Sequence, residues 1–147
     1  MIRAILAAAT ILLAAITAPA AARNKPAATL YKNPECSCCE GYAAYLRRNG
    51  FDVKVVATHD MPLLKKQHSV PEPFEGCHTT LVGGYVVEGH VPVNTLKKLL
   101  SERPRIPGVS LPGMPAGSPG MTGVKSEPFT IYELGSDPNK PRIYAVE

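Results

Sequence analysis

The spacing of apolar side chains in the first half of the chain predicts short strands and helices in alternation. Residues 27–33 form an apolar, β-prone run before a proline, which predicts a strand. Residues 35–49 place apolar side chains on one helical face, so a helix is predicted there. In residues 51–57 apolar and polar positions alternate as in a second strand. Residues 61–69, which start with a proline in the first turn, predict a short helix.

The second half begins with a hairpin signal. Residues 79–88 are two β-rich runs joined by Gly83 and Gly84, and residues 92–103 form an amphipathic helical pattern. The order strand, helix, strand, helix, hairpin, helix (β-α-β-α-β-β-α) is that of a thioredoxin-like α/β domain. The connection between the first two strands is long enough for a right-handed crossover, so we expect these strands to be parallel.

A change of composition follows the last helical pattern. Residues 104–123 contain five prolines and five glycines, and Met114 and Met121 each follow Pro-Gly in this segment. Such a composition argues against a helix or a central strand. Residues 129–134 and 142–146 predict a C-terminal β-hairpin, so we expect the Pro/Gly/Met-rich segment to be a loop tied down at both ends.

The N-terminal pattern predicts export. One positive charge precedes an apolar stretch over residues 4–18, and small residues at 20–22 match a signal peptidase site. We therefore expect residues 1–22 to be a signal peptide and residues 23–147 to form one periplasmic domain. An uncleaved anchor is the alternative. No second apolar run is long enough to span a bilayer, so no membrane association is expected after cleavage. The formal net charge of +4 comes with basic residues that gather only in pairs, which does not favour nucleic acid.

The cysteines carry the strongest chemical signal. Cys36, Cys38 and Cys39 lie at the predicted start of the first helix, where free backbone N–H groups and the helix dipole favour thiolates. Cys36 and Cys39 have the C-x-x-C spacing of thioredoxin, and Cys38 is an extra sulfur. In a thioredoxin-like fold the turn that enters the hairpin lies beside this helix start, so Cys77 is expected to face the other three cysteines.

Soft ligands at this spacing favour copper. Structural zinc sites usually draw on paired C-x₂₋₄-C knuckles, whereas thiolates this close suit Cu(I) ions that share bridging sulfurs. We therefore expect more than one copper ion, with Met114 and Met121 as supplementary ligands and packing as the alternative role for both. His90 could approach the site from the loop after the hairpin. Of Cys77 and His78, neighbours in a strand, one is expected to point away. His59 and His68 are expected to be solvated.

Four segments also resemble a known family: YKNPECSCC (31–39), GCHT (76–79), GYVVEGHVP (84–92) and PGMPAGSPGM (112–121). The chain resembles the CopG-type periplasmic proteins, long catalogued as a domain of unknown function and found with copper-resistance systems. This resemblance implies a thioredoxin-like fold, export, and copper held by the cysteines as a cysteine-bridged cluster. It also implies a role in handling Cu(I) and Cu(II). We expect copper ions, and other periplasmic copper-handling proteins, as partners.

Three interpretations stay open at this stage. The first is a copper-binding protein with Cys36, Cys38, Cys39 and Cys77 as ligands, in which a copper redox activity is not excluded. The second is a thiol-disulfide oxidoreductase that uses Cys36 and Cys39, against which the crowding by Cys38 argues. The third is a pair of structural disulfides, but the first three cysteines are too close together to connect distant parts of a fold. The sequence favours the metal-binding protein over an enzyme.

Overall fold

The computed structural model describes residues 24–147. The expected signal peptide therefore lies outside the described residues. The elements follow in this order: β1 (Ala27–Lys32), α1 (Ser37–Arg48), β2 (Asp52–Ala57), α2 (Met61–Gln67), a 3-10 turn (Glu72–Phe74), β3 (His78–Val82), β4 (Tyr85–Gly89), α3 (Val93–Glu102), β5 (Gly108–Leu111), β6 (Thr130–Leu134) and β7 (Ile143–Val146). No helix in residues 24–147 is both long and apolar enough to cross a membrane.

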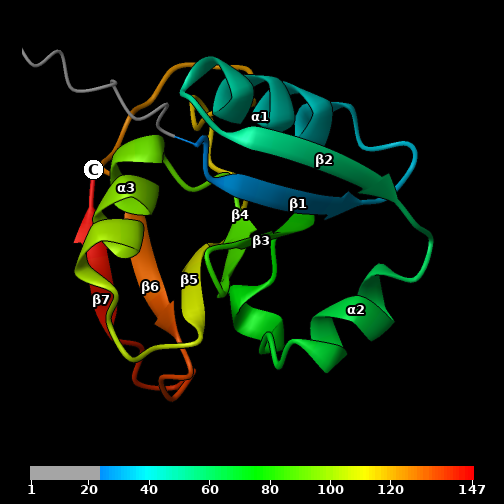
Figure 1. Cartoon of the computed structure of the whole chain (residues 1–147). Coiled ribbons are helices and arrows are strands. Elements are labelled where there is room, and N and C mark those ends of the chain that lie inside the picture. The colour runs from blue at the N-terminus through cyan, green and yellow to red at the C-terminus, as the bar shows by residue number, and fades with distance from the viewer. Residues whose placement is uncertain (1–23) are drawn as a thin grey trace, which may run out of the picture.

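All seven strands belong to one sheet, in the order β2-β1-β3-β4-β5-β6-β7 (Figure 1). β1 and β2 are parallel, as expected from the crossover through α1, and β3 is antiparallel to both β1 and β4. The α/β fold class is confirmed, and the predicted C-terminal hairpin is present as the antiparallel pair β6 and β7. The naming of the first four strands and their helices as a thioredoxin-like unit stays a prediction.

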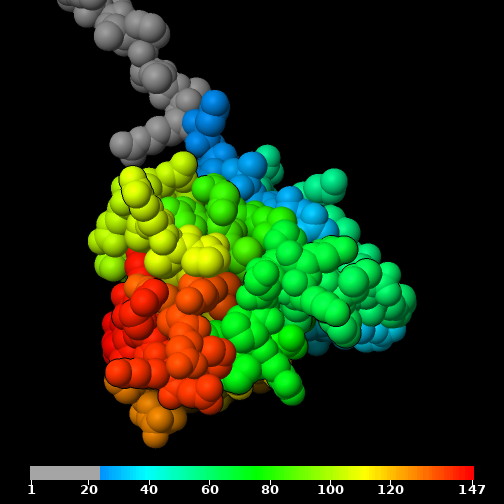
Figure 2. Space-filling model, turned by 90° about the horizontal axis from the view of Figure 1, so that it is seen from below, coloured from blue at the N-terminus to red at the C-terminus, as the bar shows by residue number. Residues whose placement is uncertain are grey.

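Alternating side chains give the sheet an apolar cluster on each face. On one face, residues of α1 and α3 such as Leu46 and Leu96 pack with Leu30 and Val87 of the sheet. On the other face, Val86 points into a smaller cluster with the segment that follows α2. Seen from below, that segment (green) and the C-terminal strands (orange to red) lie side by side (Figure 2). The larger cluster supports the start of α1, where the cysteines lie.

One expectation about the Pro/Gly-rich segment was wrong. Strand β5 lies inside residues 104–123 and is a central strand, parallel to β4 and antiparallel to β6. Its four residues contain no proline; Pro107 immediately precedes the strand and Pro112 immediately follows it. Gly108 is needed there because a Cβ at this position would collide with the carbonyl oxygen of Val86. The loop is thus shorter than predicted and begins after Leu111.

A candidate metal centre

Three cysteines gather where a tight turn leads from β1 into α1. Asn33 forms this turn: its side-chain oxygen accepts the Glu35 backbone N–H (3.0 Å), and its carbonyl accepts that of Cys36 (3.0 Å). Cys36 stands at the N-cap and makes no side-chain capping bond, while Cys38 and Cys39 lie in the first helical turn. The positive end of the helix dipole therefore points at the sulfur atoms.

Cys77 reaches the same place from the other side. His78, the first residue of β3, is paired with Lys32 at the end of β1, so the turn before β3 lies beside the start of α1. The Sγ atom of Cys77 is 3.6 Å from that of Cys39 and 3.8 Å from that of Cys38. All four cysteine Sγ atoms lie within 4.8 Å of one another, so the structure brings together the four predicted sulfur ligands.

The four cysteines differ in chemical state. Cys36 and Cys39 form a disulfide, and Cys38 and Cys77 are free thiols. The Cys38 Sγ lies 3.4 Å from the Cys36 Sγ, so a free thiol stands directly beside the disulfide. Thiolate ligation by Cys36 and Cys39 requires reduction of this bond first.

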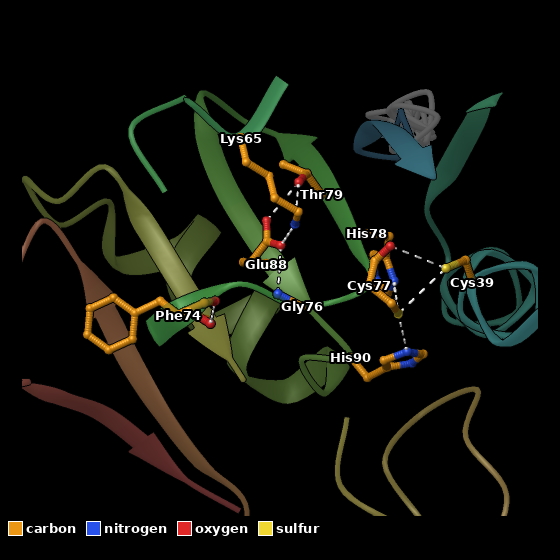
Figure 3. Close-up of polar contacts among 10 residues, drawn as sticks. Cys39, Lys65, Phe74, Gly76, Cys77, His78, Thr79, Glu88 and His90 are labelled. Atoms are coloured by element: carbon orange, nitrogen blue, oxygen red, sulfur yellow. Dashed lines mark hydrogen bonds and ion pairs between the residues drawn. The ribbon is translucent and has the colours of Figure 1, made fainter. Parts of the chain in front are cut away.

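His90 is aimed at Cys77 (Figure 3). Its Nε2 lies 3.0 Å from the Cys77 Sγ, and its Nδ1 lies 2.6 Å from the carbonyl oxygen of Pro119. Because a carbonyl can only accept, Nδ1 carries the proton and donates a hydrogen bond to the Pro119 carbonyl oxygen. Nε2 is then unprotonated and its lone pair faces the Cys77 Sγ, an arrangement typical of metal-binding histidines.

The expectation that either Cys77 or His78 points away was wrong. The Nδ1 atom of His78 lies 3.4 Å from the Cys77 Sγ. Cys77 precedes β3, so the alternation of side chains within a strand does not apply to this pair. Cys77, His78 and His90 thus form a second group of ligand atoms within 4.8 Å, which shares Cys77 with the four-sulfur group. His59 is exposed and His68 is half-buried; neither is in these groups.

Tyr42 of α1 is a site residue that the sequence analysis did not single out. It is fully buried, and its ring centroid lies 4.6 Å from that of His78 and 5.4 Å from that of His90. Its hydroxyl donates a hydrogen bond to the Val91 carbonyl (2.8 Å). Tyr42 therefore packs against both imidazole rings, and no spacing in the sequence marks it for this role.

The two predicted methionine ligands differ in position. Met121 is half-buried and Met114 is exposed (43%). The loop around Met121 packs closely on α1, since a Cβ on Gly41 would lie 2.9 Å from the Gly120 carbonyl oxygen. Pro119, in the same part of the loop, accepts the bond from His90. The second Pro-Gly-Met element is therefore docked beside the site, whereas the first is solvent-facing.

Burial sets the protonation of the ligand groups. Burial, followed by the proximity of Cys38, raises the pKa of Cys77 to about 12. Burial lowers the pKa of His90, and burial followed by the neighbouring His90 lowers the pKa of His78 well below its usual value. At neutral pH both imidazoles are therefore neutral and able to bind a metal, while Cys77 carries a proton that a metal must displace.

We expect Cu(I) affinity to rise with pH between about pH 6 and 8. Cys77 stays protonated throughout this window and releases its proton on binding, whereas the neutral histidines release none. Each proton released makes the affinity rise about tenfold per pH unit. Competition with a Cu(I) chelator at several pH values measures this slope. A flat profile would contradict thiol ligation.

The fold and the site define a class: an α/β domain with a sulfur-rich candidate metal centre between a helix start, a hairpin turn and a Pro/Gly-rich loop. Residues 74–121 match the family described as "Protein of unknown function, DUF411". Two solved structures, titled "Copper resistance protein copG- Form 2" and "Form 1", match with TM-scores of 0.75 and 0.74. Each is 33% identical over 84% of this chain and 98% of its own. The chain belongs to the CopG family of copper resistance proteins. No curated protein matches it significantly.

Proposed function

We propose that this protein binds Cu(I) through Cys36, Cys38, Cys39 and Cys77 and serves copper resistance. The observation that carries the proposal is the meeting of four sulfur atoms within 4.8 Å. Thiolates are soft ligands that prefer Cu(I), and copper resistance is the property named in the titles of both similar structures. Copper is the cargo of this site, so the protein is a metal-binding protein before it is an enzyme.

The two overlapping ligand groups support binding of more than one copper ion. Cys77 belongs to both groups, and a thiolate can bridge two Cu(I) ions. His90 and His78 add nitrogen ligands in the second of these groups. Imidazole suits Cu(II) as well as Cu(I), so this group tolerates a change of oxidation state.

The Cys36–Cys39 pair can exchange electrons with copper, because its dithiol form donates two electrons and its disulfide form accepts two. When reduced, Cys36 and Cys39 can convert two Cu(II) ions to two Cu(I) ions, forming the disulfide and releasing two protons. The reverse reaction consumes two Cu(I) ions and two protons and restores both thiols. We propose this interconversion as the redox part of copper handling, in the periplasm if residues 1–22 direct export, with other copper-handling proteins as partners.

Anaerobic titration of the fully reduced protein with Cu(I) tests the proposal. We expect more than one equivalent to bind tightly, with ultraviolet absorption from Cu(I)–thiolate bonds. A variant with all four cysteines changed to serine is the control and should bind no Cu(I) tightly. Less than one equivalent, or equal binding by the control, would overturn the proposal.

A second candidate function is a thiol-disulfide oxidoreductase, favoured by the disulfide at the start of α1. It requires the metal-free protein to reduce a disulfide substrate, with the activity lost on changing Cys36 or Cys39. The free Cys38 thiol, 3.4 Å from the Cys36 sulfur, argues against it because it would compete for any mixed disulfide. An insulin reduction assay on metal-free protein separates the two functions.

The paired Pro-Gly-Met elements allow a matched test of the methionine ligands. Met121→Leu is expected to lower Cu(I) affinity by about tenfold, whereas Met114→Leu leaves it unchanged. The reason is that the loop around Met121 is docked on α1 and Met114 is exposed. Chelator competition measures both variants under the same conditions. Binding by Met121→Leu as tight as that of the wild type would remove Met121 from the ligand set.

A further inference from the structure

A hydrogen-bonded group of charged and polar side chains lies beside the turn that carries Cys77 (Figure 3). Glu88 of β4 is completely buried, and Lys65 of α2 is 5% exposed. One carboxylate oxygen of Glu88 accepts hydrogen bonds from Lys65 and from the backbone N–H of Gly76 (2.8 Å). The other accepts the hydroxyl of Thr79 (2.7 Å). Three donors, one from α2 and two from the turn and strand at residues 76–79, therefore converge on one carboxylate.

Such an arrangement needs a local reason. A buried ion pair costs so much desolvation that apolar side chains of similar volume often give equal or greater stability. Overall stability is thus a weak explanation for Glu88 and Lys65. What apolar side chains cannot do is accept the Gly76 N–H, which is otherwise left without a partner at a partly buried turn.

Gly76 immediately precedes Cys77, and its turn is held at three successive points by the segment that ends β4. Glu88 accepts the Gly76 N–H. Gly89 packs against Gly76 so closely that a Cβ on Gly76 would lie 2.6 Å from the Gly89 Cα. His90 then faces the Cys77 Sγ at 3.0 Å. Glu88 therefore lies two residues before the candidate ligand His90. Its carboxylate also accepts a hydrogen bond from Gly76, the residue before the candidate ligand Cys77.

We propose that Glu88, paired with Lys65, is a positioning residue that holds Cys77 in place for copper through the Gly76 N–H. This inference rests on the proposed copper function. Glu88 touches no sulfur atom in the structure, so its effect passes through the backbone of the turn. Residues that orient metal ligands in this indirect way typically change metal affinity by roughly 10- to 100-fold when they are replaced.

Two double variants isolate the hydrogen bond from the charge. Lys65→Met with Glu88→Gln removes both charges but keeps an oxygen that can accept the Gly76 N–H. Lys65→Met with Glu88→Leu removes the charges and the acceptor. By chelator competition, the Gln variant should bind Cu(I) within about threefold of wild type and the Leu variant roughly 10- to 100-fold more weakly. Glu133→Gln, which breaks the partly exposed pair with Arg142, is the control and should have no effect.

A second measurement separates positioning from a general loss of structure. When Cys77→Ser is added to both double variants, the difference between Gln and Leu should disappear. A difference of the same size in that background, or equal binding by the two double variants, would overturn the inference. If the Leu variant does not fold, hydrogen exchange of the Gly76 amide decides: it should be protected in the metal-free wild type, and exchange at the rate of a free amide would overturn the inference.

The copper function and the positioning role of Glu88 can be tested separately. Absence of tight Cu(I) binding by the wild type would overturn the proposed function and, with it, the role of Glu88 in copper binding. Normal Cu(I) binding without a Cys77-dependent difference would overturn the role of Glu88 alone.

Discussion

Cys77→Ser is expected to reduce Cu(I) binding more than any other single cysteine substitution. Cys77 is the one cysteine that belongs to both groups of ligand atoms identified in residues 24–147. Its loss breaks the four-sulfur group and the sulfur–imidazole group at once. We expect a fall in affinity of more than about 100-fold, above the range for residues that only orient ligands. We also expect fewer copper equivalents at saturation.

Cys36→Ser is the matched comparison, because Cys36 belongs to the four-sulfur group alone. This variant should keep the ion held by Cys77 and the two histidines and lose only part of the copper. Titration of both reduced variants, with copper quantified after removal of free metal, measures the difference. If Cys36→Ser loses as much copper as Cys77→Ser, Cys77 does not have the shared role that the geometry assigns to it.

The oxidation state of the protein should produce the second large effect. With the Cys36–Cys39 disulfide formed, only two of the four thiols are free, so the oxidised protein is expected to bind at most about half the copper of the reduced protein. Parallel anaerobic titrations of protein that has been reduced and desalted, and of protein left oxidised, measure the ratio.

A variant without this disulfide provides the control. Cys36→Ser combined with Cys39→Ser should bind the same amount of copper with or without prior reduction, at the level of the oxidised wild type. Equal copper binding by oxidised and reduced wild type would show that Cys36 and Cys39 are not ligands. A strong dependence on reduction in the double variant would assign the redox effect to Cys38 or Cys77 instead.

The features that depend on local sequence could be predicted. Prolines, glycines and the spacing of apolar residues marked all the helices and strands except β5 to within a few residues, because they act on the backbone directly. The approach of Cys77 to the helix start was also predicted, from the place of the corresponding turn in a thioredoxin-like fold. The partial burial of Met121 did not follow from its sequence, which matches that of the exposed Met114.

The errors arose where an outcome depends on a boundary or on tertiary packing. A one-residue shift in the start of β3 decided whether Cys77 and His78 share a side. Strand β5 was not predicted because the Pro/Gly-rich composition was judged over 20 residues, and the four proline-free residues of the strand were not considered separately. The bond from His90 to Pro119 joins positions 29 residues apart and has no sequence signature. Glu88 and Lys65 likewise pair only after α2 packs on the sheet.

The two halves of the disulfide differ in accessibility, and this gives its reduction a direction. Cys39 is fully buried, whereas Cys36 is only half-buried at the edge of the helix start. A reducing thiol that arrives from solvent can therefore attack Cys36, forming the mixed disulfide there and releasing Cys39 as the leaving group. The sulfur set free is the one that already lies 3.6 Å from Cys77. The first thiolate that reduction produces is thus the buried one that faces Cys77, and it forms while Cys36 is still bound to the reductant.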